Sequence, residues 1–268
     1  MYSGTTLHSR SGNLVGAHQK FDRVARRFIK TLRNDAFFPT ITHILHFEGN
    51  NGPDAIKRKS PGTDEPWHFW NPTNKDDTRL LKTIDEHYAA LVSSLKAKEE
   101  ERAAFEAAWL AHAIVDGLTP AHHYEYEEKL TELRGEGIET RTSLRHKVVI
   151  PADTRREAMS KNWQMWGAKG LIISHVTFEF GVASVAKPHM FKNAIPREGD
   201  IKHAKNVGLD EYLRENALII HNLNMYERFL ARGWNATLAH DIRRVLCPKT
   251  IESVAVAWAL AIDEAQDV

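Results

Sequence analysis

Residues 105–122 read FEAAWLAHAIVDGLTPAH, and they carry the strongest structural signal in the chain. As far as residue 118, nearly every face of a helix built from this stretch is apolar or small, apart from His112 and Asp116. A helix without a polar face is typical of the centre of a domain. Because an unpartnered carboxylate is costly to bury, His112 and Asp116 need partners inside the core.

Two further segments with apolar patterning lie on either side of this central helix. Residues 15–33 have helical apolar spacing and include His18. Residues 168–186 again bury a His and an acid one turn apart, His175 and Glu179, although their β-branched content leaves a strand as an alternative. Further helices are expected over residues 76–95, 209–232, 236–246 and 249–264. We predict an all-α, single-domain multi-helix bundle over residues 1–268, with a buried metal cluster.

Two segments interrupt the helical pattern. Residues 46–72 are dense in Gly, Pro, Asn and Asp, which predicts an ordered loop carrying Asp54 and His68. Residues 125–161 are highly charged in both signs and predict a solvated inserted segment, with a weak helix or hairpin inside it.

Charge and cysteine content limit the functional classes. Lys plus Arg total 36 and Asp plus Glu total 35, so no large uniform field favours a stable nucleic-acid complex. The single cysteine, Cys247, can form neither an internal disulfide nor a thiolate metal site. Any metal must therefore be held by nitrogen and oxygen ligands.

Targeting signals are not evident. The first residues, MYSGTTLHSRSGNLVG, lack the apolar region of a secretory signal, and no run of eighteen uninterrupted apolar residues predicts a transmembrane segment. We therefore expect a soluble, cytoplasmic protein.

Histidine is unusually frequent, with fifteen copies. Four His residues precede an acid by four positions, where about two such pairs are expected by chance, so the spacing alone means little. For any one pair, a buried hydrogen bond is the simpler explanation. The two pairs inside apolar helices, His112/Asp116 and His175/Glu179, together favour a metal site.

The turn after the central helix adds a third candidate ligand, His122. Gly117 and Pro120 turn the chain sharply, so His122 is directed back toward the central helix. The resulting H-x3-D-x5-H pattern, with Pro two residues before the last His, resembles the zinc-dependent phospholipase C and single-strand nuclease superfamily. Thr119 stands where that superfamily has Gln. Four further segments are similar in order: His18, Asp54, His68 in an aromatic His-Phe-Trp context, and His175 with Glu179.

The resemblance implies two to three zinc ions. One ion would bind Asp54, His68, His112 and Asp116, a second His122, His175 and Glu179, and a third His18 with Asp116 as a bridge. Members of the superfamily complete the third site with an N-terminal Trp. His8 or the terminal amine is the candidate substitute here, and the alternative is an altered or empty third site.

The resemblance also implies a zinc-dependent hydrolase of phosphate esters, a phospholipase C-like phosphodiesterase with Asp54 as the catalytic base. Phe69, Trp70 and Asn71 are candidates for substrate binding, although core packing explains the aromatic residues equally well. Asn71 stands where the nucleases usually carry a base-reading Asp. The alternatives are a nuclease or small-molecule phosphoesterase of the same fold, or a metal-stabilised binding protein without catalysis.

Overall fold

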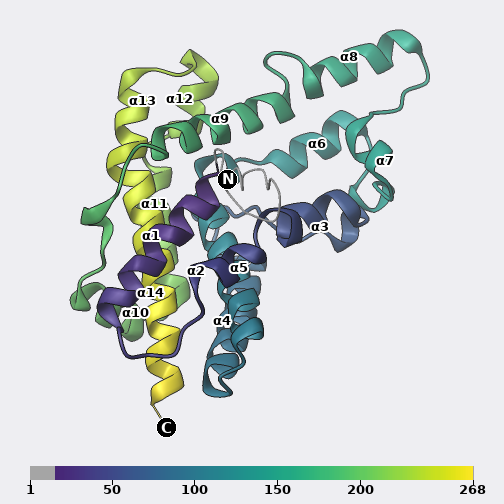
Figure 1. Cartoon of the computed structure of the whole chain (residues 1–268). Helices are drawn as coiled ribbons and strands as arrows, with labels where there is room; N and C mark the ends of the chain where they lie inside the picture. The colour runs from purple at the N-terminus through teal and green to yellow at the C-terminus, as the bar shows by residue number, and fades with distance from the viewer. Residues whose placement is uncertain (1–15, 268) are drawn as a thin grey trace.

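A helix buried on nearly every face lies at the centre of the computed structural model, which describes residues 16–267 and contains no strand within them. This helix, α14 (Cys247–Gln266), continues a helical run through α13 (Ala236–Asp241) and a π-turn at Ile242–Leu246 (Figure 1). Small and apolar side chains from residue 254 to residue 262 are all buried, which lets neighbouring helices approach closely. The prediction of an all-α, single-domain fold is confirmed.

Within the described residues, one helical run, Ala236–Gln266, is long and apolar enough to cross a membrane by length and composition. The mean hydropathy of its most apolar window is 1.5, and 78% of that window is buried inside the protein. A core helix of a globular protein has the same properties, and α14 occupies that position here.

Five helices surround α14. α4 (Arg79–Lys96) and α5 (Glu100–Gly117) form a tightly packed hairpin, and Trp258 of α14 donates a hydrogen bond from Nε1 to the carbonyl of Ala107 on α5 at 3.1 Å. α1 (Ala17–Leu32), α10 (Glu198–Val207) and α11 (Leu209–His221) also pack against α14. α5 is therefore enclosed between α4, α14 and α1, as its apolar sequence predicts.

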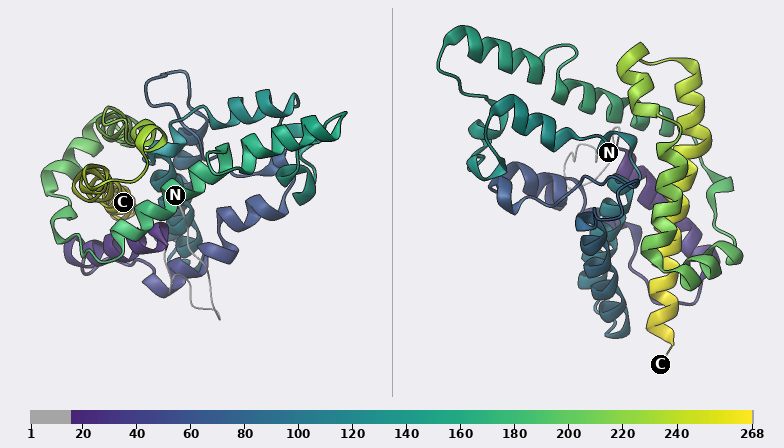
Figure 2. Two further views of the ribbon diagram at one scale, coloured as in Figure 1. Left: turned by 90° about the horizontal axis from the view of Figure 1, so that it is seen from above. Right: turned by 180° about the vertical axis from the view of Figure 1, so that it is seen from behind.

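Residues 125–170 project from the bundle and are called the arm here (Figures 1 and 2). They form α6 (Tyr126–Arg134), α7 (Leu144–Val148) and α8 (Arg155–Trp166), with α8 packed against both α6 and α9 (Leu171–Ala186). Leu130, Ile150 and Met165 build a small hydrophobic cluster separate from the main core. The charged segment is thus more helical than its sequence predicts, because it has its own apolar contacts.

Other departures from the predicted elements are local. The segment expected to be a loop contains the helix α3 (Pro53–Lys59). Pro53 occupies the first helical position, where its missing N–H is tolerated. Asp54 lies in the first turn, where the helix dipole favours a carboxylate. The helix expected over 209–232 is divided into α11 and α12 (Met225–Arg232) by Asn224, whose φ is 47°. α2 (Ile41–His46) and α10 were not predicted.

Candidate metal centre

α5 supplies the two central groups of the site. His112 and Asp116 are one turn apart and buried, and His112 Nε2 lies 3.2 Å from Asp116 Oδ2. Of the four His–acid pairs in the sequence, this one and His175/Glu179 form close side-chain pairs. These two pairs are the ones that lie in apolar helices. The apolar sequence around a His–acid pair therefore indicated which pairs belong to the site.

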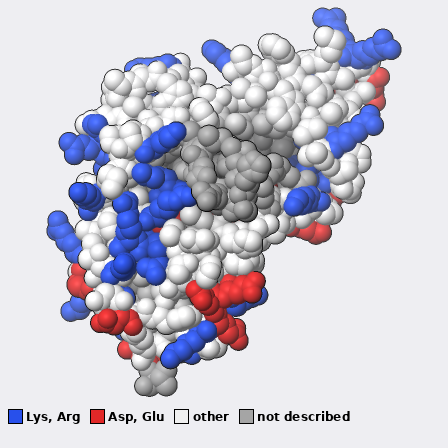
Figure 3. All heavy atoms as spheres, viewed as in Figure 1, with Lys and Arg blue, Asp and Glu red and all other residues white. Residues whose placement is uncertain are grey.

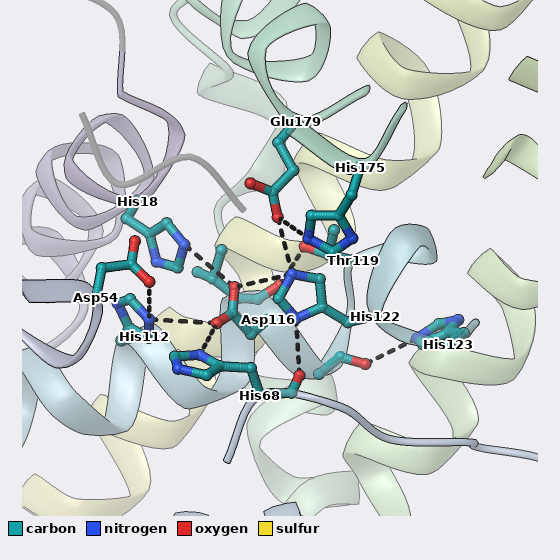
Figure 4. Close-up of polar contacts among 12 residues, drawn as sticks. His18, Asp54, His68, His112, Asp116, Thr119, His122, His123, His175 and Glu179 are labelled. Carbon is teal, nitrogen blue, oxygen red and sulfur yellow. Dashed lines mark hydrogen bonds and ion pairs between the residues drawn. The ribbon is translucent and has the colours of Figure 1, made fainter. Parts of the chain in front are cut away.

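The turn after α5 fixes the orientation of His122. Thr119 begins the turn and donates a hydrogen bond from Oγ1 to the carbonyl of Val115 at 2.7 Å. His122 then donates from Nδ1 to the carbonyl of His68 at 2.7 Å, which leaves its Nε2 directed at Glu179 Oε1 at 2.8 Å (Figure 4). A backbone hydrogen bond of this kind selects the tautomer that presents Nε2 as a ligand.

α9 completes a group of three on that side of the site. His175 Nε2 lies 3.0 Å from Glu179 Oε1, and the ligand atoms of His122, His175 and Glu179 all lie within 4.8 Å of one another. These are the residues expected to hold the second zinc.

A second group of three forms around His112. Asp54, from the first turn of α3, has Oδ1 3.8 Å from His112 Nε2, and the ligand atoms of Asp54, His68 and His112 lie within 4.8 Å of one another. Asp116 Oδ2 also accepts a hydrogen bond from His68 Nδ1 at 2.6 Å. All four residues expected at the first zinc are therefore adjacent.

His18 enters the same site from the first turn of α1. Its ring stacks on that of His112 with centroids 4.1 Å apart, and its Nε2 lies 3.2 Å from Asp116 Oδ1. Asp116 thus contacts residues of the first and third expected sites through its two oxygens, as a bridging carboxylate would. Figure 4 shows Asp116 between the imidazoles.

Glu48 is a member of the site that the sequence did not reveal. It is buried, its Oε1 lies 3.3 Å from His112 Nδ1, and it belongs with His18 and His112 to a third group of ligand-type atoms within 4.8 Å. A carboxylate on the far nitrogen of a metal-binding His orients the ring and raises its basicity. Nothing in the spacing around Glu48 distinguishes it from an ordinary loop acid.

Unsatisfied nitrogens show that these residues suit a metal. Among the described residues, both ring nitrogens of His18 and the Nε2 atoms of His68 and His112 are buried without a hydrogen-bond partner. Buried polar atoms nearly always have a partner, and here the orphaned nitrogens converge on carboxylates. A divalent cation would satisfy both, so the donor set fits the metal that the sequence implies.

The electrostatics lead to the same conclusion. Burial and the Lys57 ammonium lower the pKa of His68 to about 3, so this imidazole is neutral and can act as a ligand. Burial alone would lower the pKa of His112. The carboxylates of Asp116 and Glu48 outweigh this effect and raise the pKa of His112 well above its ordinary value. Burial and Glu48 also raise the pKa of Asp22 well above its usual range. The buried acids therefore favour additional positive charge in the site.

A cavity of about 430 Å³ opens onto the cluster. Five ligand-type residues line it: Asp54, His68, His122, His175 and Glu179. The rest of the lining consists of aromatic and aliphatic residues, three cations and two further acids: Lys57, Glu65, Pro66, Trp67, Phe69, Tyr126, Glu127, Leu130, Ile138, Arg141, Leu144, Lys147, Val148, Trp166, Ile172 and Val176.

Only one of the three predicted substrate-binding residues lines this cavity, Phe69. Trp70 is a core residue that is 1% exposed, and its Nε1 donates a hydrogen bond to the carbonyl of Asp77 at 3.1 Å. Its ring lies close to Gly117, and a Cβ added at Gly117 would lie 3.4 Å from the ring. Asn71 is outside the lining and accepts a hydrogen bond from Thr73 Oγ1 at 2.7 Å. The prediction for Trp70 and Asn71 is corrected accordingly.

His8, the expected substitute at the third site, lies outside the described residues. His123 points away from the cluster and donates from Nε2 to the carbonyl of Gly117 at 2.8 Å (Figure 4). Burial lowers the pKa of His123 to about 3, so it is a neutral residue that fixes the end of α5.

Comparison of the chain with protein-family models, curated proteins and solved structures finds no match.

Proposed function

We propose that this protein is a zinc-dependent hydrolase of phosphate esters, and specifically a phospholipase C-like phosphodiesterase. One observation supports this most directly: five of the eight expected ligands, Asp54, His68, His122, His175 and Glu179, line a cavity and are not enclosed by protein. A structural metal site is enclosed by its protein ligands, whereas a catalytic site leaves a position for water and substrate.

The ligands are assigned by their adjacency. Asp54, His68, His112 and Asp116 would hold one zinc ion, and His122, His175 and Glu179 would hold a second. A third would bind His18, with Asp116 as the bridge. Divalent ions held by these residues would supply positive charge to the oxygens of a phosphate and would lower the pKa of a bound water molecule.

Asp54 is the acid best placed to act on a water molecule. Its side chain is 36% exposed, whereas Asp116 is 1% and Glu179 11% exposed. Burial alone would raise the pKa of Asp54, but the imidazoles of His112 and His68 hold it at about 2, so the carboxylate is ionised at neutral pH. It can therefore bind a metal through one oxygen and orient water, and accept its proton, through the other.

Lys57 is proposed to bind a phosphate oxygen. It lies one turn after Asp54 on α3, lines the cavity, and has its Nζ 5.5 Å from the centroid of the Phe69 ring. The other two cations of the cavity are already paired, Arg141 with Glu127 and Lys147 with Glu65. Lys57 is therefore the cation best able to neutralise a substrate phosphate.

The apolar part of the cavity favours a phosphodiester with a large hydrophobic substituent. Aromatic rings of Trp67, Phe69 and Tyr126 and the aliphatic chains of Ile172 and Val176 can bury an acyl or aryl group. The Phe69 and Tyr126 rings are stacked on each other, with centroids 5.2 Å apart. This apolar lining favours the phospholipase-like substrate over a small hydrophilic phosphoester.

The function is tested by hydrolysis of bis(p-nitrophenyl) phosphate and of a short-chain phosphatidylcholine by zinc-replete protein. Both activities should disappear with a chelator and return with added zinc. A nucleotide diester and a phosphomonoester are assayed in the same way. If none of the four substrates is hydrolysed and the chelator still lowers the melting temperature, the metals serve stability alone.

A further inference from the structure

Several large apolar side chains are exposed on the outer surface of the arm. Met159 and Trp163 of α8 are 75% and 72% exposed, and Leu144 of α7 is 57% exposed. Trp166, at the end of α8, is 39% exposed and lies at the wall of the cavity. Tryptophan and methionine are rarely exposed to this extent, and a contiguous apolar patch usually marks a binding surface.

The exposed residues of α8 form one stripe. Met159, Trp163 and Trp166 are spaced by four and three residues, so they share a face of the helix. Met165 lies on the other side and is fully buried with Leu130 and Ile150 in the small cluster of the arm. α8 therefore already has a buried face, and the exposed stripe is a second apolar face with no contact in the main core.

The charge of the arm is divided between its two halves. Residues 125–140 contain six acids and two basic residues, whereas residues 141–170 contain seven basic residues and two acids. The basic half is the half that carries the apolar stripe. Arg145, Arg155, Arg156 and Lys169 within it are exposed, and Lys and Arg side chains are visible at the end of the arm in Figure 3. The chain as a whole has a net charge of only +1, so this is a local feature.

We propose that the surface formed by α7 and α8 docks on a membrane containing anionic lipids. Exposed Trp, Met and Leu can enter the interfacial region of a bilayer, while the flanking Arg and Lys contact lipid phosphates. Each basic residue near an anionic surface strengthens the association. A positively charged surface of this kind favours an anionic partner over a second copy of the same surface, because two copies would repel each other.

The exposed stripe lies next to the cavity lined by candidate metal ligands. Leu144 and Trp166 belong both to the exposed surface and to the lining of the cavity. Docking through this surface would bring the opening of the cavity close to the lipid headgroups. The proposal does not rest on the hydrolase function, since vesicle binding is measured without turnover.

The test is co-sedimentation of the full chain with vesicles of phosphatidylcholine alone and of phosphatidylcholine with 30% phosphatidylserine. We expect binding to the mixed vesicles, with an affinity that falls as salt is raised. The double variant Met159→Ser/Trp163→Ser and the double variant Arg155→Gln/Arg156→Gln should each weaken this binding at least about tenfold.

Two control variants keep the result specific. Ile219→Ser removes an apolar residue of α11 that is 47% exposed, and Arg27→Gln/Lys30→Gln removes two cations from the basic surface of α1. Both should bind the mixed vesicles like the parent. The proposal is overturned if the parent fails to bind the mixed vesicles, or if the α1 variant loses binding and the α8 variants keep it. It is also overturned if the parent is a dimer in solution and the Met159→Ser/Trp163→Ser variant is a monomer.

Discussion

Asp116 contacts more imidazoles of the cluster than any other acid with described contacts, so Asp116→Asn is the most informative substitution. Its Oδ2 lies 2.6 Å from His68 Nδ1 and 3.2 Å from His112 Nε2, and its Oδ1 lies 3.2 Å from His18 Nε2. Asn keeps the shape but loses the negative charge and directs an amide N–H₂ group at one of these partners. We expect the variant to lose at least one of the bound zinc ions.

The loss of stability can be estimated from the burial. Asp116 is 1% exposed, and removing one partner from a buried, charge-paired group costs about 3–5 kcal/mol. At roughly 2–4 °C for each kcal/mol in a chain of this size, the melting temperature of the zinc-loaded protein should fall by about 6–20 °C. Calorimetry and elemental analysis of the same samples measure both effects.

Glu106→Gln is the matched control, because Glu106 is a buried acid of the same helix, 1% exposed and paired with His87 and Arg102 outside the cluster. It should lower the melting temperature without changing the zinc content. If Asp116→Asn retains the parental zinc content and melting temperature, Asp116 does not bridge metals and the assignment of the ligands is wrong.

Three further substitutions test separate parts of the account. Asp54→Asn should keep the fold and most of the zinc but lower phosphodiester hydrolysis about 10²- to 10⁴-fold, because Asn retains an oxygen ligand but cannot accept a proton; hydrolysis at the parental rate would exclude the assigned role. Lys57→Gln should reduce kcat/KM for phosphodiesters about tenfold or more, with unchanged zinc content, whereas Lys59→Gln, at an exposed position of the same helix, should leave kcat/KM unchanged. Burial and the neighbouring Asp85 carboxyl raise the pKa of Asp210 to about 6. The folded state therefore binds more protons than the unfolded state between about pH 4 and 6, and stability falls as pH rises through that range. Asp210→Asn should thus raise the melting temperature at pH 7.5 and have little effect at pH 4, and an equal shift at both pH values would contradict this explanation.

The central helix and its metal ligands could be predicted because the relevant pattern is local. On α5, the spacing of His112 and Asp116 places them on one face, and the apolar sequence around them requires burial. The turn at Pro120 then limits the direction of His122 to one side of the helix end. Similar reasoning identified His175 and Glu179, because their helix is also apolar on nearly every face.

The parts that could not be predicted depend on tertiary contacts. Glu48 becomes a partner of His112 only because residues 64 positions apart in the sequence come together. Trp70 is buried because its ring packs beside Gly117 at the end of α5, which no pattern around Trp70 indicates. The helices of the arm form because Leu130, Ile150 and Met165 meet, and the high charge of that segment conceals these three residues.

The most direct test is the number of zinc ions bound per chain, measured by elemental analysis after exhaustive dialysis of zinc-replete protein. The convergence of Asp54, His68, His112 and Asp116 beside His122, His175 and Glu179 predicts at least two ions. A protein that retains none would contradict the metal centre, and with it the proposed hydrolysis.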